Sequence, residues 1–124
     1  MTTTKYRPSR GTLFSQKKVS LEDKIYIEII EAVANQFNVP VVNMISRRRF
    51  RDLSLARNMA FYILHTTFRQ NAAQIAPYFN RDRTTVLHGL NTFVNDIETI
   101  PFYMERYEMV MNNITLPDNI YALK

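Results

Sequence analysis

Apolar side chains recur at every third or fourth position along most of the stretch between residues 21 and 111, and this spacing constrains the fold more than any other feature of the sequence. A clear example is the series Ile25, Ile29, Ile30, Val33 and Phe37, which would form one face of a helix. No segment alternates apolar and polar residues for long enough to predict a strand. We therefore predict an all-α fold with about six helices.

Capping residues and prolines divide this stretch into its helices. The predicted starts are at Ser20, Pro40, Leu53, Asn71 (with Gln74 in capping-box position), Asp82 and Pro101. The run 46–51 has no apolar face, so we predict a loop there. We expect a flexible basic arm over residues 1–19, one helical domain over 20–115 and a tail over 116–124.

Positive charge is segregated along the chain. The net charge is +5, and the cations gather in residues 1–20, 47–57 and 58–83, whereas 21–46 and 84–124 are net negative. A surface that binds phosphates explains such segregation. The alternative is that the arginines only keep loops soluble.

Several classes of protein do not fit the sequence. There is no cysteine, which excludes disulfides and thiolate metal sites. The only histidines, His65 and His88, lie in no metal or nucleophile pattern, and Glu105 and Glu108 fit a solvated helix face. We expect no catalysis, no cofactor and no metal. No apolar run has the length of a membrane span or a signal peptide, so we expect a cytoplasmic, nucleoid-associated protein from a bacterium or a phage.

Two neighbouring helices match a helix-turn-helix. Asn71–Phe79 would support the second helix, Asp82–Asp96, whose first residues would reach base edges in the major groove. Those residues are Asp82, Arg83, Thr84 and Thr85.

Each of these side chains can form a contact with the edge of a base. Arg83 can bond to guanine O6 and N7, and a threonine offers a hydroxyl and a methyl group. Asp82 can accept from a cytosine amino group or can simply cap the helix. The backbone N–H groups at the helix start also suit a phosphate. We expect the following apolar residues to belong to the core: Val86, Leu87 and Leu90.

An arginine run forms the second candidate element. It contains Arg47, Arg48, Arg49 and Arg51. These side chains would line phosphates, or one of them would enter a narrow minor groove. The alternative is a run that is only solvated. Further phosphate candidates are Arg57, Arg69 and Arg81, although Arg69 would equally stabilise a helix C-terminus.

The run 80–88, Asn-Arg-Asp-Arg-Thr-Thr-Val-Leu-His, resembles the signature of the DNA-binding domain of the bacterial replication initiator DnaA. The arginine run 46–51 and the following 56–60 resemble that domain's basic loop and the start of its next helix. The resemblance covers roughly residues 21–98. It implies that Arg49 enters the minor groove, that Arg57 contacts the DNA backbone and that residues 82–85 lie in the major groove.

Two residues depart from the family signature. Arg83 stands where the family has a histidine, so the base preferred there is expected to differ. Of the family's two adjacent glycines, one is missing and the other is Asn80, since asparagine tolerates left-handed geometry. We therefore expect the turn to be one residue shorter and the second helix to sit differently.

The sequence contains no phosphate loop of the Gly-x-x-x-x-Gly-Lys-[Ser/Thr] type and no room for an ATPase domain. We therefore expect a stand-alone domain that binds specific sites on double-stranded DNA as a transcription regulator, as a monomer or weak dimer. One alternative is a replication accessory or a competitor for initiator sites. Another is an adaptor whose last helix, from Phe102 to Met111, docks on RNA polymerase or another regulator; otherwise that helix packs on the core.

Overall fold

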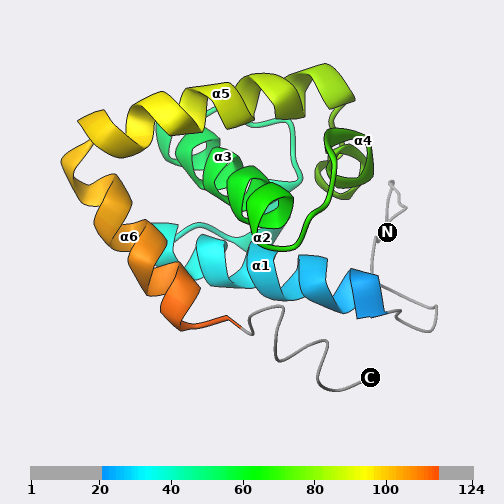
Figure 1. The fold of residues 1–124 in the computed structure, drawn as a ribbon, viewed down its shortest axis with the longest axis horizontal. Helices are drawn as coiled ribbons and strands as arrows, with labels where there is room; N and C mark the ends of the chain where they lie inside the picture. The colour runs from blue at the N-terminus through cyan, green and yellow to red at the C-terminus, as the bar shows by residue number, and fades with distance from the viewer. Residues whose placement is uncertain (1–20, 115–124) are drawn as a thin grey trace.

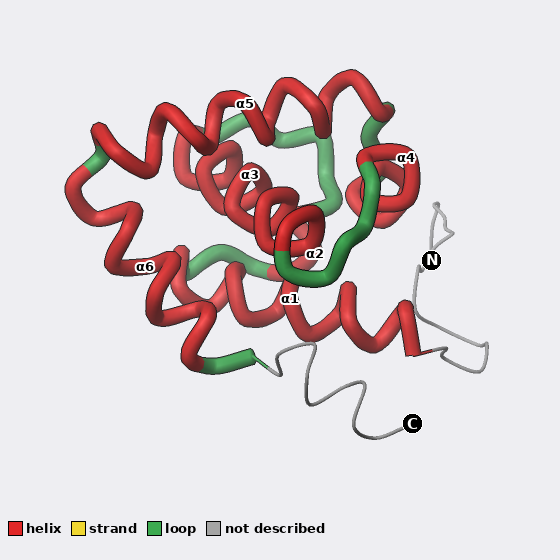
Figure 2. Tube along the Cα trace, in the orientation of Figure 1, coloured by secondary structure: helices red, strands yellow, loops and turns green. Residues whose placement is uncertain are grey.

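The computed structural model describes residues 21–114, which form six α-helices and one short 3-10 helix. These are α1 (Leu21–Phe37), α2 (Val41–Met44), α3 (Arg51–Thr66), α4 (Ala72–Ile75), η1 (Ala76–Phe79), α5 (Arg83–Thr99) and α6 (Pro101–Asn112). The all-α prediction is confirmed: Figure 2 shows the described residues as helices joined by loops. The predicted basic arm, the Ser20 cap and the tail lie outside the described residues.

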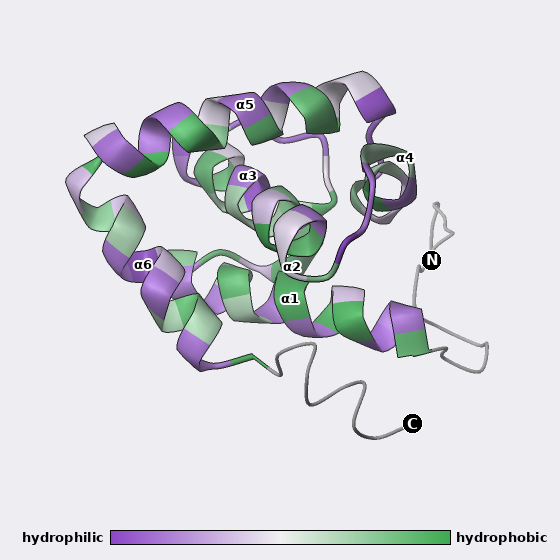
Figure 3. Ribbon diagram, in the orientation of Figure 1, coloured by the Kyte–Doolittle hydropathy of each residue, from purple (hydrophilic) through white to green (hydrophobic). Residues whose placement is uncertain are grey.

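Helix α3 occupies the centre of the fold. Figure 1 shows α1 and α5 on opposite sides of α3, with α6 closing one end and α4 lying near the other. Each long helix carries apolar and polar residues together (Figure 3), as expected for a helix with one face turned to a core. Core side chains that are fully shielded from solvent include Ile29, Met59, Ile63, Phe79 and Val86.

The helix starts follow local capping rules. Asn71 and Gln74 form the predicted capping box, in which each side chain accepts a backbone N–H at 2.8 Å. The segment 76–79 tightens into a 3-10 turn around Pro77, which has no N–H to donate. The predicted start of α3 near Leu53 was too late: the helix begins at Arg51, because the Phe50 carbonyl already accepts the Ser54 N–H at 3.0 Å.

Helix α6 packs on the core, which is one of the two roles that we predicted for it from the sequence. Tyr103 and Val110 are fully buried, and the Tyr103 hydroxyl donates to the Leu55 carbonyl. Three apolar residues that flank this buried stripe stay partly exposed: Phe102, Met104 and Met109.

The start of α1 is braced against η1 by a pair of tyrosines. The rings of Tyr26 and Tyr78 stack with their centroids 3.6 Å apart. The Tyr78 hydroxyl donates to Asp23, and the Tyr26 hydroxyl donates to Gln70 at 2.8 Å. The first helix thereby fixes the supporting element of the helix-turn-helix.

Candidate nucleic-acid interface

The turn before α5 has left-handed geometry at Asn80. Its φ of 56° and ψ of 44° fall in the region that asparagine tolerates, as predicted. The Arg81 N–H closes the turn on the Ala76 carbonyl at 3.0 Å. Asp82 then caps α5 as predicted: its carboxylate accepts the Thr85 N–H at 2.8 Å. This bond and a second one from the Thr85 hydroxyl lower the pKa of Asp82.

Helix α5 turns only part of its apolar surface to the core. Val86 and Phe93 are buried and Leu90 is half-buried, whereas Leu87 is 41% exposed and Val94 is 52% exposed. The prediction that Leu87 belongs to the core is therefore wrong. Leu87 and Val94 lie seven positions apart, on one exposed stripe beside the buried residues of α5.

A glycine brings α5 close to α3. A Cβ atom on Gly89 would lie 2.5 Å from Asn58 Oδ1 and 2.8 Å from a ring carbon of Phe61. Phe61 is itself fixed, since it is 1% exposed and packs edge-on against Phe79. The missing side chain thus sets how close the two helices lie and where the first turn of α5 is presented.

The first turn of α5 presents its polar side chains to solvent. Arg83, Thr84 and Thr85 are all exposed. We predicted base contacts for these three residues from the sequence, and no residue of 21–114 covers them.

Arg57 is the one charged residue that the fold buries among residues 21–114. It is 5% exposed, and its guanidinium donates to the backbone carbonyls of Met44, Arg48, Asn43 and Ser46 at 2.7–2.9 Å. Its burial, together with the neighbouring charges of the other arginines, lowers the pKa of Arg57 to about 10. Arg57 therefore holds α2 and the start of the arginine loop (residues 46–50) in place from within.

Arg81 ties the helix-turn-helix to the same loop. Its guanidinium donates to the Ser46 carbonyl at 2.6 Å, so one carbonyl accepts from both Arg57 and Arg81. Weaker bonds of 3.3 Å reach the carbonyls of Phe79 and Asn80. Burial, followed by the charges of Arg47 and Arg49, lowers the pKa of Arg81. The loop and the turn before α5 are thus joined through Ser46.

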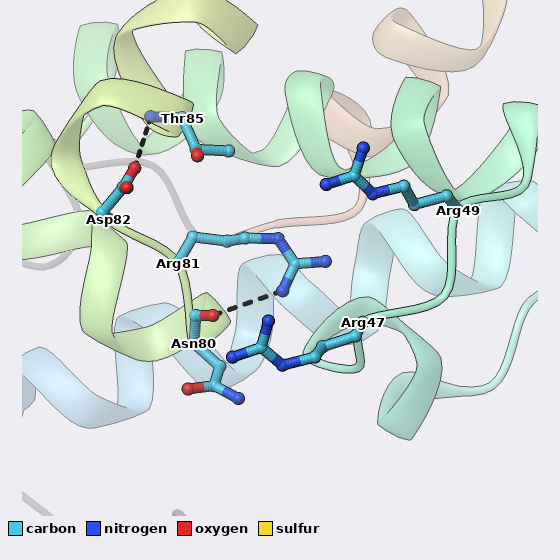
Figure 4. Close-up of a pocket in the computed structure, with 6 residues that line it drawn as sticks. All are labelled: Arg47, Arg49, Asn80, Arg81, Asp82 and Thr85. Atoms are coloured by element: carbon cyan, nitrogen blue, oxygen red, sulfur yellow. Dashed lines mark hydrogen bonds between the residues drawn. The ribbon is translucent and has the colours of Figure 1, made fainter.

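A pocket of about 450 Å³ lies between the loop and the start of α5. It is lined by Arg47, Arg49, Asn80, Arg81, Asp82 and Thr85. Figure 4 shows Arg47 and Arg49 approaching from the loop side and Asp82 and Thr85 from the α5 side, with the Arg81 guanidinium between them. Three arginines around one carboxylate, which is already engaged by Thr85, leave the pocket positively charged.

The remaining candidates lie around this pocket or apart from it. Arg48 and Arg51 are exposed, Arg48 within the loop and Arg51 in the first turn of α3. Arg69 is exposed in the turn after α3, with a φ of 59°, and does not line the pocket. Arg57 has little surface to offer a phosphate, and its expected contact with the DNA backbone stays a prediction.

The sequence did not predict the contacts that hold the loop, the turn and α5 together. The link through the Ser46 carbonyl and the close approach at Gly89 depend on main-chain atoms and on packing between distant segments. One signal was present in the sequence: Arg57 stands at helical spacing between the apolar residues Leu53 and Phe61.

Two other kinds of feature are absent from the part of the chain that the structure describes. Within residues 21–114, no three histidine, aspartate or glutamate side chains cluster in a way that would hold a metal ion. Among the described helices, none combines the length and the apolar character needed to cross a bilayer.

Residues 27–92 match the family model described as the bacterial dnaA protein helix-turn-helix. The chain is 32% identical over 100 residues to the chromosomal replication initiator protein DnaA of Oenococcus oeni, a match that covers 80% of this chain and 21% of that protein. It is 28% identical over 119 residues to chromosomal replication initiator protein DnaA 2 of Chlamydia trachomatis, covering 94% of this chain and 25% of that protein. The matches therefore span about a quarter or less of these relatives.

The matched domain is a DNA-binding module and not a catalytic one. This agrees with the prediction that the chain is not an enzyme.

Proposed function

Because this chain belongs to the bacterial DnaA helix-turn-helix family, we propose that it binds specific sites on double-stranded DNA and acts there as a transcription regulator. In this proposal Asp82, Arg83, Thr84 and Thr85 face the major groove, and the arginine loop lies at the adjacent minor groove with Arg49 entering it. The protein acts in the cytoplasm on the nucleoid, as a monomer or weak dimer.

The observation that carries this proposal is the link between the loop and the start of α5. Arg57 and Arg81 both bind the Ser46 carbonyl, which fixes two exposed cationic elements on either side of one pocket. When a helix lies in the major groove and a loop in the next minor groove, one sugar-phosphate strand must pass between them. In this proposal that strand passes over the pocket lined by Arg47, Arg49 and Arg81, whose positive charge suits a backbone phosphate.

Selection of binding sites from a random duplex library tests the proposal directly. At about 150 mM salt we expect a short enriched motif, because direct readout from α5 distinguishes bases. We also expect affinity to fall by about 10³ between 50 and 200 mM salt if about six cations meet phosphates. Binding without enrichment would contradict sequence specificity, and no binding would contradict the whole proposal.

A second candidate function is competition for the sites of a replication initiator. It is favoured by one observation, that the relatives compared above are chromosomal replication initiator proteins. Measuring whether the chain displaces such an initiator from its own site separates the two functions. Displacement at equal concentration favours competition, whereas a selected motif unlike the initiator site favours independent regulation.

A further inference from the structure

Phe50, at the end of the arginine loop, has a large apolar side chain that is exposed to solvent. It is 57% exposed and lies between Arg49 and Arg51. Its backbone is extended, with φ −90° and ψ 154°, and it precedes the first turn of α3. Among residues 21–114, the Arg48 guanidinium lies over this ring, 6.0 Å from its centre.

The loop presents two different sides. Arg47 and Arg49 line the pocket next to α5, whereas Arg48 lies over the Phe50 ring. One side of the loop is thus purely cationic, and the other combines one cation with one aromatic ring.

The ring is held by a rigid backbone on both sides. Arg57 binds the carbonyls of Ser46 and Arg48, and the Phe50 carbonyl is fixed by the Ser54 N–H at 3.0 Å. A rigid aromatic side chain with only two side-chain torsions loses little conformational freedom when it is buried by a ligand. Phe50 therefore has the properties of a contact residue, although the helix-turn-helix itself does not use it.

We propose that Phe50 is an apolar wedge that enters the minor-groove edge of a base-pair step beside the arginine loop. This inference rests on the proposed function. Apolar side chains that enter the minor groove partly unstack a step and bend the duplex toward the major groove. Pyrimidine–purine steps unstack most easily, so the wedge gives a preference for a TA or CA step under the loop. Arg48 stays next to the ring and neutralises the phosphate beside the opened step.

The proposal is tested with the full chain and a set of duplexes that carry the selected motif. Each duplex has a single 2-aminopurine at a different base-pair step under the loop. Wild-type protein should raise 2-aminopurine fluorescence at one step and bend the DNA, measured by energy transfer between end labels. Phe50→Ala should abolish both signals, flatten the step preference and weaken binding about tenfold. Phe50→Leu, which keeps an apolar wedge, should retain most of the bend.

The control is Met109→Ala, which removes a similarly exposed apolar side chain from α6, outside the site. It should leave bend, fluorescence and affinity unchanged, and thermal unfolding should show both alanine variants folded. If Phe50→Ala binds, bends and selects steps as the wild type does, the wedge is overturned while the proposed function stands. If the wild type binds no duplex, both fail together.

Discussion

Arg57 and Arg47 belong to one cluster of arginines but lie in opposite environments. The first is 5% exposed and donates to four carbonyls, whereas the second is exposed at the rim of the pocket. The same division runs through the whole site. An inner layer, made of Arg57, Arg81 and Gly89, holds the loop, the turn and the helix in place. An outer layer, made of Arg47, Arg49 and Arg83, faces solvent.

This difference shows that residue type alone does not assign an arginine to DNA contact. A guanidinium whose donors are occupied by carbonyls stabilises the fold, and one whose donors face water is available to phosphates and bases. The inner layer should therefore affect stability and binding to every sequence. The outer layer should affect affinity and base preference with little effect on stability.

The largest effect is expected for Arg57→Met, which leaves buried carbonyls without a donor. We expect the free energy of unfolding to fall by about 3 kcal/mol, since hydrogen bonds to a charged group are the stronger ones. For a domain of this size that lowers Tm by roughly 15 °C. Urea unfolding measures the first quantity and calorimetry the second.

Arg57→Lys provides the matched control for this prediction. It keeps the charge but loses the planar fork that reaches several carbonyls at once, so it should recover little of the stability. If Arg57→Met unfolds like the wild type and only DNA binding weakens, Arg57 contacts a phosphate and belongs to the outer layer.

Gly89→Ala tests the inner layer at the contact between α3 and α5. The added Cβ would lie 2.5 Å from Asn58 Oδ1 and 2.8 Å from the Phe61 ring. We expect a loss of about 1–2 kcal/mol, because the overpacking exceeds the roughly 1 kcal/mol by which alanine favours a helix over glycine. Asn95→Ala, at an exposed position of the same helix, should be nearly neutral. An increase in stability at position 89 would mean that Asn58 and Phe61 move aside freely.

Arg83→Ala tests the outer layer. Binding to the preferred site should weaken by about 1–3 kcal/mol and one base position should lose its preference, while stability changes by less than about 0.5 kcal/mol. Binding-site selection with the variant measures the preference. Arg69→Ala, also exposed but away from the pocket, should weaken binding to all sequences alike. An unchanged motif for Arg83→Ala would show that α5 does not read bases through this residue.

The sequence predicts those parts of the site that depend on local rules. The capping box at Asn71, the cap at Asp82 and the left-handed Asn80 each follow from a residue and its near neighbours. The inner layer does not, because Arg57 binds carbonyls up to 14 positions away and Arg81 binds one 35 positions away. Leu87 was misassigned because apolar spacing does not give the width of the buried stripe.

The smallest effect is expected for Asp82→Asn, which changes the one carboxylate of the outer rim. Bonds from the Thr85 N–H and hydroxyl lower the pKa of Asp82 below its ordinary value of 3.8, so the fold favours the ionised form. Its contribution to stability is complete above the ordinary pKa and is lost as pH falls through the lower folded value. Asparagine caps equally well but does not titrate.

The difference in unfolding free energy between wild type and Asp82→Asn should therefore be constant from pH 7 to 5 and change below about pH 4, when both are followed by urea unfolding across this range. A difference that stays constant down to pH 2 would contradict the role of the ionised cap.

The same variant shows whether Asp82 only caps α5 or also contacts a base. If Asp82 only caps the helix, Asp82→Asn leaves the base preference unchanged. It then strengthens binding to all sequences slightly, because a negative charge beside Arg81 is lost. A shifted preference at one position would show instead that Asp82 accepts a bond from a base, which would extend the outer layer to a residue that also holds the helix.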